Sequence, residues 1–479
     1  MRQISFLLAW SFMYGLYGQV VSDTVYTITT ATDLPYAAAV DFAGNERQLT
    51  LDLSVPTDDE PPACGRPLLL VIHGGAWLAG SKDDGTIRRM REDFAKRGYA
   101  TAAINYRLGL FQTSSAIHCN ATNFGLAWDC LQAADSSEWY RANYRGIQDA
   151  HAALRYLTVQ ADNWQIDPQQ VFLIGESAGA FIALGTGFID RQEEVLTEYT
   201  SAQADLNPPN PIYEAPCIQG LQLDTSLASL QLSRPDLGTF TGQPLTDTLP
   251  YRIRGVAAFY GAVFNDIWAT ANGQAPTLYL FHQPNDLIVP IGYQRLLQGY
   301  AACLTGFPFN CSNIYQRPHA YGSQAIAERL TQLGSGAPEL QLEITNNFAN
   351  CAVQVLDPSQ QGHRLDGYWL RTSQVASLFA AKVGACLTAT DEPMEPAGPD
   401  LRLFPNPLGA DRLLHIRGDL APGDQIRLWT STMQLSWTTK WEASGTEATL
   451  ALPAQLPAGV YLLEVIGPDH HLTKTLILR

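Results

Sequence analysis

The sequence predicts an α/β fold, with a mostly parallel sheet covered by helices on both faces, followed by a small all-β C-terminal sandwich. Three observations lead to this prediction. Apolar strand-like runs alternate with helix-like segments from Gln48 to about Val383, as in chains that build parallel sheets. A stretch rich in proline and acidic residues, 391–400, interrupts that pattern. Short alternating strands separated by turns then fill the rest of the chain, which is typical of an antiparallel sandwich.

The bulk composition fits a globular protein with one large domain and a second, smaller one. Of the 479 residues, 46% are hydrophobic and 16% are charged. The formal net charge of -16 argues against nucleic acids and anionic membrane surfaces as partners, because a polyanion would be repelled.

The N-terminus has the pattern of a secretory signal peptide. A short basic start precedes an apolar stretch from Ile4 to about Leu16, which ends near the small residue Gly18. We therefore expect residues 1–18 to be cleaved and the protein to be exported. Later apolar runs are too short to cross a bilayer, so we expect no transmembrane segment.

Eight cysteines lie in the middle of the chain, and in an exported protein they favour disulfides over free thiols. The short spacings Cys119–Cys130 and Cys303–Cys311 predict two local bridges. A metal site is the alternative, but no CxxC or paired histidine spacing supports it. The cysteines without a predicted pairing are Cys64, Cys217, Cys351 and Cys386.

The expected strands are short apolar runs, and one expected helix carries an apolar stripe in NYRGIQDAHAALRYLTVQAD. Two long segments without periodicity, about 109–143 and 190–254, interrupt the alternation. Such insertions are usually functional loops or lids, and the alternative is a solvated decoration of the fold. The candidate strands are QLTLDLSV, PLLLVIHGG, YATAAINYRL, VFLIGES, GVAAFYGA, TLYLFHQP and CAVQVLD.

One short stretch, VFLIGESAGAF, points to chemistry because it places Ser177 between Gly175 and Gly179. The spacing GxSxG is weak by itself, and Ser177 could be only a small residue where a helix packs on a sheet. The context is more specific. An apolar strand precedes Ser177 and small residues open a helix after it, which is the strand–turn–helix that presents a nucleophilic serine.

Acyl transfer to a serine also needs backbone donors for the oxyanion and an acid that orients the base. The turn HGGAW follows an apolar strand, and its Gly74 and Gly75 join the N–H of Ala178 as the expected oxyanion donors. Asp286 follows the strand TLYLFH and is the expected acid. Asp266 follows an earlier strand and is the alternative.

The base must be one of nine histidines. His363 follows the last expected strand, CAVQVLD, and completes the chain order Ser, Asp, His. His73 belongs to the oxyanion turn, and His282 precedes Asp286 at the same strand end. We therefore expect Ser177, Asp286 and His363 to form a catalytic triad that requires no cofactor and no metal.

These motifs together carry a family resemblance. HGGAW, YRGIQDAHAALRYL, IDPQQ, GESAG, HQPNDLIVP and GH resemble the carboxylesterase and lipase branch of the α/β-hydrolases over about Pro67 to Ala381. The resemblance implies an α/β-hydrolase fold and a serine carboxylic ester hydrolase that acts through an acyl-enzyme. The aromatic residues of the first insertion point to a small-molecule or glycan-linked ester as the substrate, and packing is the alternative role for them. One departure is Ala76, which replaces the third glycine of the family's HGGG form.

The C-terminal region resembles a second family. LRLFPNP, PAGVYLLEV and KTLILR are similar to the C-terminal sorting domain of type IX secretion. The resemblance implies export through the periplasm of a diderm bacterium, the type IX machinery as a partner, and a secreted or cell-surface protein. The expected organisation is a signal peptide (1–18), a hydrolase domain (19–390), a linker (391–400) and a sorting domain (401–479).

Two other hypotheses remain. A catalytically silent hydrolase fold would serve as a surface binding or adhesion module, although such a module has no reason to keep Ser, Asp and His in register. A serine peptidase or acyl transferase on the same fold would use the same residues, and a substrate panel would separate it from an esterase.

Overall fold

The structure is a computed structural model of the 479-residue chain. It describes residue 24, residues 26–110 except 43 and 59, and residues 136–201, 234–242, 249–268, 275–299, 317–345, 353–354 and 361–384. Further along, it describes residues 402–404, 408, 412–417, 421–430, 435–441, 447–457, 459–467 and 471–478. The chain forms two compact units, Met1–Cys386 and Leu387–Arg479. The predicted signal peptide and linker lie outside the described residues.

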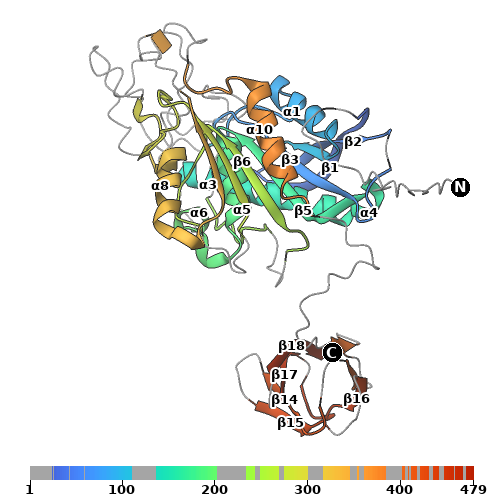
Figure 1. The fold of residues 1–479 in the computed structure, drawn as a ribbon. Helices are drawn as coiled ribbons and strands as arrows, with labels where there is room; N and C mark the ends of the chain where they lie inside the picture. Colours follow the sequence, from blue (N-terminus) through green and yellow to red (C-terminus); the bar gives the residue numbers. More distant parts are fainter. Residues whose placement is uncertain are drawn as a thin grey trace, which may run out of the picture. The chain divides into compact units, whose positions relative to one another are not determined.

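The first unit is built on one eight-stranded sheet with the order β1-β2-β4-β3-β5-β6-β8-β11 (Figure 1). Only the pairs β1·β2 and β2·β4 are antiparallel, and the other pairs are parallel. The predicted α/β fold with a mostly parallel sheet is therefore confirmed. The strands are β1 (Ile28–Val40), β2 (Glu46–Pro56), β3 (Arg66–Ile72), β4 (Ala100–Ile104), β5 (Ile166–Glu176), β6 (Ile253–Phe259), β8 (Thr277–His282) and β11 (Leu340–Ile344).

Helices cover both faces of this sheet, and β3 shows why. Its even-numbered residues Leu68 and Leu70 belong to the core beneath α3, α5 and α8. Its odd-numbered residues Leu69 and Val71 pack in a second core beneath α1 and α10. A strand buried on both faces has to be apolar throughout, as the run PLLLVI is. The helices are α1 (Gly85–Ala95), α3 (Ser136–Val159), α5 (Ala178–Phe188), α8 (Ser323–Leu333) and α10 (Tyr368–Ala380).

Shorter elements join this framework. A three-stranded sheet has the order β7-β10-β9. Helix α3 begins at Ser136, so the first predicted insertion ends earlier than the expected Asn143. The second predicted insertion begins with the short helices η2 and α6. The shorter elements are α4 (Ala161–Trp164), η2 (Gln192–Glu194), α6 (Thr197–Thr200), β7 (Ala262–Val263), β9 (Tyr293–Arg295), β10 (His319–Gly322) and η5 (Gly334–Gly336).

One strand prediction is wrong. The last strand of the sheet is β11, Leu340–Ile344, whereas Val353 and Gln354 within the predicted strand CAVQVLD are helical. The reason is that β11 lies at the edge of the sheet, beside β8 alone. An edge strand is only partly buried, so the sequence LQLEI lacks the continuous apolar run that marks the central strands.

The second unit is all-β, as predicted. It contains a three-stranded sheet, β12-β13-β16, and a four-stranded sheet, β15-β14-β17-β18, and every strand pair is antiparallel. Leu414 of β13 and Leu428 of β14 share one buried core, so the two sheets form a sandwich. The strands are β12 (Arg402–Phe404), β13 (Leu413–Arg417), β14 (Gln425–Thr430), β15 (Leu435–Lys440), β16 (Glu447–Ala451), β17 (Gly459–Ile466) and β18 (His471–Leu478).

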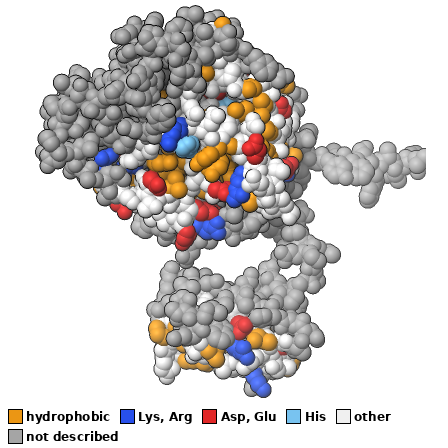
Figure 2. All heavy atoms as spheres, turned by 90° about the vertical axis from the view of Figure 1, so that its left-hand side faces the viewer, with side chains coloured by type: hydrophobic (Ala, Val, Ile, Leu, Met, Phe, Trp, Pro, Cys, Tyr) orange, Lys and Arg blue, Asp and Glu red, His pale blue; other side chains and the backbone are white. Residues whose placement is uncertain are grey.

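Three further observations bear on the sequence predictions. No helix in the described part of the chain is long and apolar enough to cross a membrane. Cys64 is disulfide-bonded, while the predicted pairs Cys119–Cys130 and Cys303–Cys311 lie outside the described residues. On the face shown in Figure 2, acidic and basic side chains are interspersed among hydrophobic ones, so the net negative charge is not gathered there in one patch.

Candidate active site

Ser177 occupies a tight turn between β5 and α5. Its φ of 52° lies in the left-handed region that few non-glycine residues adopt. The flanking glycines are required by close packing. A Cβ on Gly175 would lie 2.1 Å from the carbonyl oxygen of Gly179, and a Cβ on Gly179 would lie 2.2 Å from that of Ile72. The GxSxG spacing therefore reflects a strained strand–turn–helix.

The structure brings the three residues expected to form the triad into one hydrogen-bonded chain. Ser177 Oγ lies 2.7 Å from His363 Nε2, and His363 Nδ1 lies 2.7 Å from Asp286 Oδ2. The carboxylate accepts from Nδ1–H, which leaves the Nε2 lone pair facing the serine hydroxyl. Asp266, the alternative acid, instead pairs with the exposed Arg329 at 2.6 Å.

Asp286 is held rigidly by the loop after β8. Its side chain is fully buried, and its Oδ1 accepts the backbone N–H groups of Ile288 at 2.8 Å and Val289 at 3.0 Å. Burial alone would raise the pKa of Asp286, but the neighbouring His363 and His282 outweigh it, so the pKa is lowered overall. His282 Nε2 lies 3.3 Å from Asp286 Oδ2. The sequence placed His282 near the acid without revealing this contact.

The turn that follows β3 lies directly against Ser177. A Cβ on Gly74 would lie 3.1 Å from Ser177 Cβ, and Gly75 has a φ of 106° that favours glycine. Among the described residues, no backbone carbonyl accepts the N–H of Gly74, Gly75 or Ala178, the three donors that the sequence predicts for the oxyanion. Ala76, which replaces the family's third glycine, has a φ of 55° and so adopts the conformation that glycine would adopt without strain.

His73 stabilises this turn by a hydrogen bond. Its Nδ1–H donates to the carbonyl oxygen of Gly74 at 2.7 Å, and its ring stacks on Tyr106 with the centroids 4.3 Å apart. Burial lowers the pKa of His73 to about 4, so the ring is neutral at physiological pH. This agrees with the structural role that the sequence suggested for His73.

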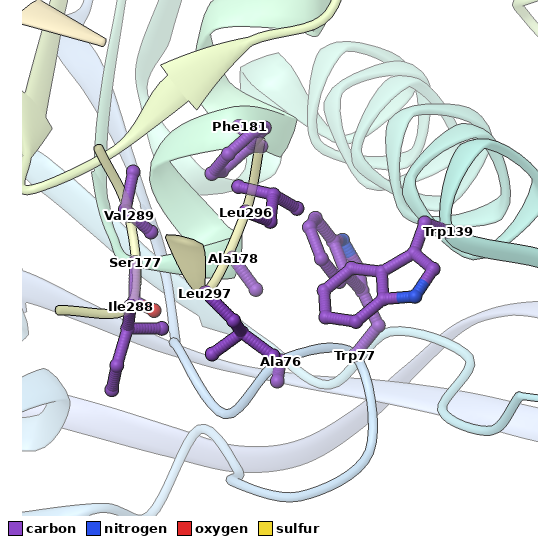
Figure 3. Close-up of a pocket in the computed structure, with 10 residues that line it drawn as sticks. All are labelled: Ala76, Trp77, Trp139, Ser177, Ala178, Phe181, Ile288, Val289, Leu296 and Leu297. Atoms are coloured by element: carbon purple, nitrogen blue, oxygen red, sulfur yellow. The ribbon is translucent and has the colours of Figure 1, made fainter. Parts of the chain in front are cut away.

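A small apolar pocket opens beside the Ser177 hydroxyl (Figure 3). Trp77 and Trp139 stand edge to face at one side of it, with their ring centroids 5.8 Å apart. Its other described walls are aliphatic or aromatic, and none of the described lining residues is charged. The walls also include Phe181, Ile288, Leu296 and Leu297.

Two polar residues near the triad were missed by the sequence analysis. Glu176 immediately precedes Ser177, and Tyr260 follows β6. Their hydrogen bond joins two segments that are 84 residues apart, which no local pattern reveals. Within the described residues, no group of three or more histidine, cysteine, aspartate and glutamate side chains could hold a metal ion.

Comparisons with known proteins agree with this architecture. The BD-FAE family model matches residues 51–121 and 142–210, which include the oxyanion turn and Ser177. The chain has an α/β-hydrolase fold. The strand order of the sheet carries that conclusion, and the match over β3, β4, β5 and the serine turn agrees with it.

Similar sequences include esterases. A carboxylesterase, patB, of Aspergillus clavatus is 29% identical over 238 residues, covering 45% of this chain and 37% of that protein. A probable isoprenylcysteine alpha-carbonyl methylesterase, ICME, of Oryza sativa subsp. japonica is 29% identical over 140 residues, covering 29% of this chain and 26% of that protein. The chain thus spans well under half the length of these relatives.

Similar solved structures include the apo form of Thermogutta terrifontis esterase 2. It is 15% identical, with a TM-score of 0.38, and the alignment covers 75% of this chain and 95% of that one.

Proposed function

We propose that the protein is a serine carboxylic ester hydrolase. The observation that carries the proposal is the continuous chain of hydrogen bonds from Ser177 Oγ through His363 to Asp286, with 2.7 Å at each link. A serine, an imidazole and a buried carboxylate in this order form the arrangement that activates a hydroxyl nucleophile.

In the acylation step, Ser177 Oγ forms a bond to the acyl carbon while His363 Nε2 takes the hydroxyl proton. The carbonyl electron pair moves onto the oxygen, where the N–H groups of Gly75 and Ala178 stabilise the negative charge. The ester C–O bond then breaks, and His363 returns the proton to the leaving alcohol. Asp286 stabilises the imidazolium throughout.

Deacylation repeats these steps with water. His363 takes a proton from water while the water oxygen attacks the acyl carbon. The C–O bond between the acyl carbon and Ser177 Oγ then breaks. The proton passes to Ser177 Oγ, and the carboxylic acid leaves. Every proton in this cycle starts and ends on the substrate, water or these side chains.

The apolar pocket supports an assignment of substrate groups. Because it opens beside Ser177 and its described walls carry no charge, it suits a small, uncharged acyl group.

A panel of chromogenic esters of rising acyl length, run beside the matching amides, tests the proposal. We expect hydrolysis of short and medium acyl esters and little cleavage of amides. A preference for amides would favour a peptidase, and the absence of activity on every ester would favour a binding module.

We further propose that the protein is exported and that its C-terminal unit is a type IX sorting signal. The sequence motifs at both ends support this, as does the separate hydrophobic core of the second unit. Truncation near Thr390 in the native host should strand an active enzyme in the periplasm, while fusion of residues 391–479 to a periplasmic reporter should carry the reporter out. Normal secretion of the truncated form would contradict the proposal.

A further inference from the structure

Tyr260 directly follows β6, and Ser177 directly follows the neighbouring strand β5. The two strands are parallel, and Glu176 pairs with Phe259, so Ser177 and Tyr260 are the next residues on each. Both have a positive φ, 52° for Ser177 and 42° for Tyr260. A bulky residue in this region carries a strain of about 1–3 kcal/mol, and such strain persists where surrounding contacts impose it.

The Tyr260 side chain contacts two residues of the site, Glu176 and His363. Its hydroxyl donates to Glu176 Oε2 at 2.9 Å. Its ring stands edge to face with the imidazole of His363, with centroids 4.8 Å apart and planes at 73°. Tyr260 is 6% exposed, so neither contact is loosened by solvent.

Glu176 is the second carboxylate near His363. Burial raises the pKa of Glu176, while the Tyr260 hydroxyl and His363 oppose that rise. The charge of Asp84 also raises the pKa of Glu176. Glu176 and Asp84 in turn raise the pKa of the neighbouring Tyr106. Burial and the nearby carboxylates raise the pKa of Tyr260 well above its ordinary value, so its hydroxyl remains a donor.

The imidazole itself faces Ser177 on one side and Asp286 on the other, and His282 reaches it only through Asp286. When His363 takes the serine proton, a cation forms beside Asp286, and the charge of Glu176 also acts on it. A carboxylate that is already oriented stabilises that cation without reorganisation.

We propose that Tyr260 is a positioning residue for the reaction, whose hydroxyl fixes Glu176 beside His363 so that this second carboxylate stabilises the imidazolium. The inference rests on the proposed ester hydrolase function. It also explains why a tyrosine keeps a strained backbone at this strand end.

Tyr260→Phe tests the role, because it removes the hydroxyl and keeps the ring against His363. We expect kcat on a short-chain ester to fall about tenfold, with KM changed by less than about twofold, since Tyr260 does not line the pocket beside Ser177. Tyr279→Phe is the matched control. Its hydroxyl also makes a 2.8 Å hydrogen bond, to Gln374, but β8 carries it away from the triad. It should leave kcat unchanged.

Glu176→Gln separates positioning from packing. It should lower kcat about as much as Tyr260→Phe does, and it should move the acid limb of the kcat/KM profile about half a pH unit or more toward lower pH, because the imidazolium loses a stabilising charge. In the double variant, Tyr260→Phe should cause no further loss, because its effect passes through the carboxylate.

Three outcomes would overturn this role. They are wild-type kcat in Tyr260→Phe, an unshifted acid limb in Glu176→Gln, or a full additional loss in the double variant. A folded wild-type protein that hydrolyses no ester would refute the proposed function and this role together. Activity in the wild type with an unchanged Tyr260→Phe would refute this role alone.

Discussion

The two sides of the site are built in different ways. Ser177 is placed by its own backbone, because Gly175 and Gly179 allow β5 and α5 to meet at a strained turn. His363 is placed by contacts from other segments. The N–H of Gly362 donates to Gln354 Oε1 at 2.9 Å, and Gln354 Nε2 donates to the carbonyl oxygen of Asn285 at 2.9 Å.

The difference teaches which substitutions affect geometry and which affect chemistry. The nucleophile turn is a local structure, so its glycines matter for packing and its serine for reaction. The loop that carries His363 depends on buried side chains, such as Gln354, that take no part in the reaction. Changes there should reduce activity by displacing His363 rather than by removing a reacting group.

The largest effect is expected for Ser177→Ala. Loss of the nucleophile should reduce kcat by about five to six orders of magnitude, because the rest of the triad has no hydroxyl to activate. The melting temperature should stay nearly the same, since alanine keeps the turn's backbone strain unchanged. Ester hydrolysis and thermal unfolding measure the two effects. Activity within tenfold of the wild type would reduce Ser177 to a packing residue.

Asp286→Asn should come next, with kcat reduced by about 10⁴-fold, because an amide cannot stabilise the imidazolium. Asp266→Asn is the matched control, as its carboxylate forms a half-exposed pair with Arg329. It should change kcat by less than about twofold. The opposite ranking in steady-state kinetics would exchange the roles of the two aspartates.

Activity should fall as pH decreases, because a protonated imidazole cannot accept the serine proton. The lowered pKa of Asp286 means that this carboxyl binds a proton only below its ordinary range, so it stays ionised while activity is being lost. On the acid limb, kcat/KM should fall about tenfold per pH unit. A flat profile from pH 5 to 9 would exclude His363 as the rate-determining base.

Gln354→Leu tests whether the loop that carries His363 depends on contacts with distant segments. It leaves the N–H of Gly362 and the carbonyl of Asn285 without their partner, so kcat should fall about tenfold. Gln374→Leu is the control, since that amide bonds Tyr279 and Glu343 away from the triad. Equal kinetic losses in the two variants, at similar melting temperatures, would show that the link to the His363 loop is unimportant.

The smallest effect is expected for Trp139→Ala, which should enlarge the pocket beside Ser177. The ratio of kcat/KM for a longer acyl ester to that for an acetyl ester should rise about three- to tenfold. Trp268→Ala removes a buried tryptophan that packs on Phe188 and does not line the pocket. An equal shift in both variants would indicate general loosening instead of a change in pocket size.

The sequence predicted the central strands, the serine turn and the three residues that the structure joins by hydrogen bonds. It did so because these features have local signals. Strands buried on both faces are apolar throughout, and the glycines around Ser177 are demanded by backbone contacts within a few residues or on the adjacent strand. Chain order alone then placed Asp286 and His363 after later strands.

Other features required the tertiary structure. Edge strand β11 was missed because it is partly exposed and its pattern is weak. The contacts of His282, Glu176 and Tyr260 were missed because each depends on which strand ends lie side by side. The sequence by itself determined the fold class and named the candidate reacting groups, since both follow from local patterns. Only the folded sheet decided which buried side chains orient those groups, because hydrogen bonds between distant segments leave no periodic trace in the chain.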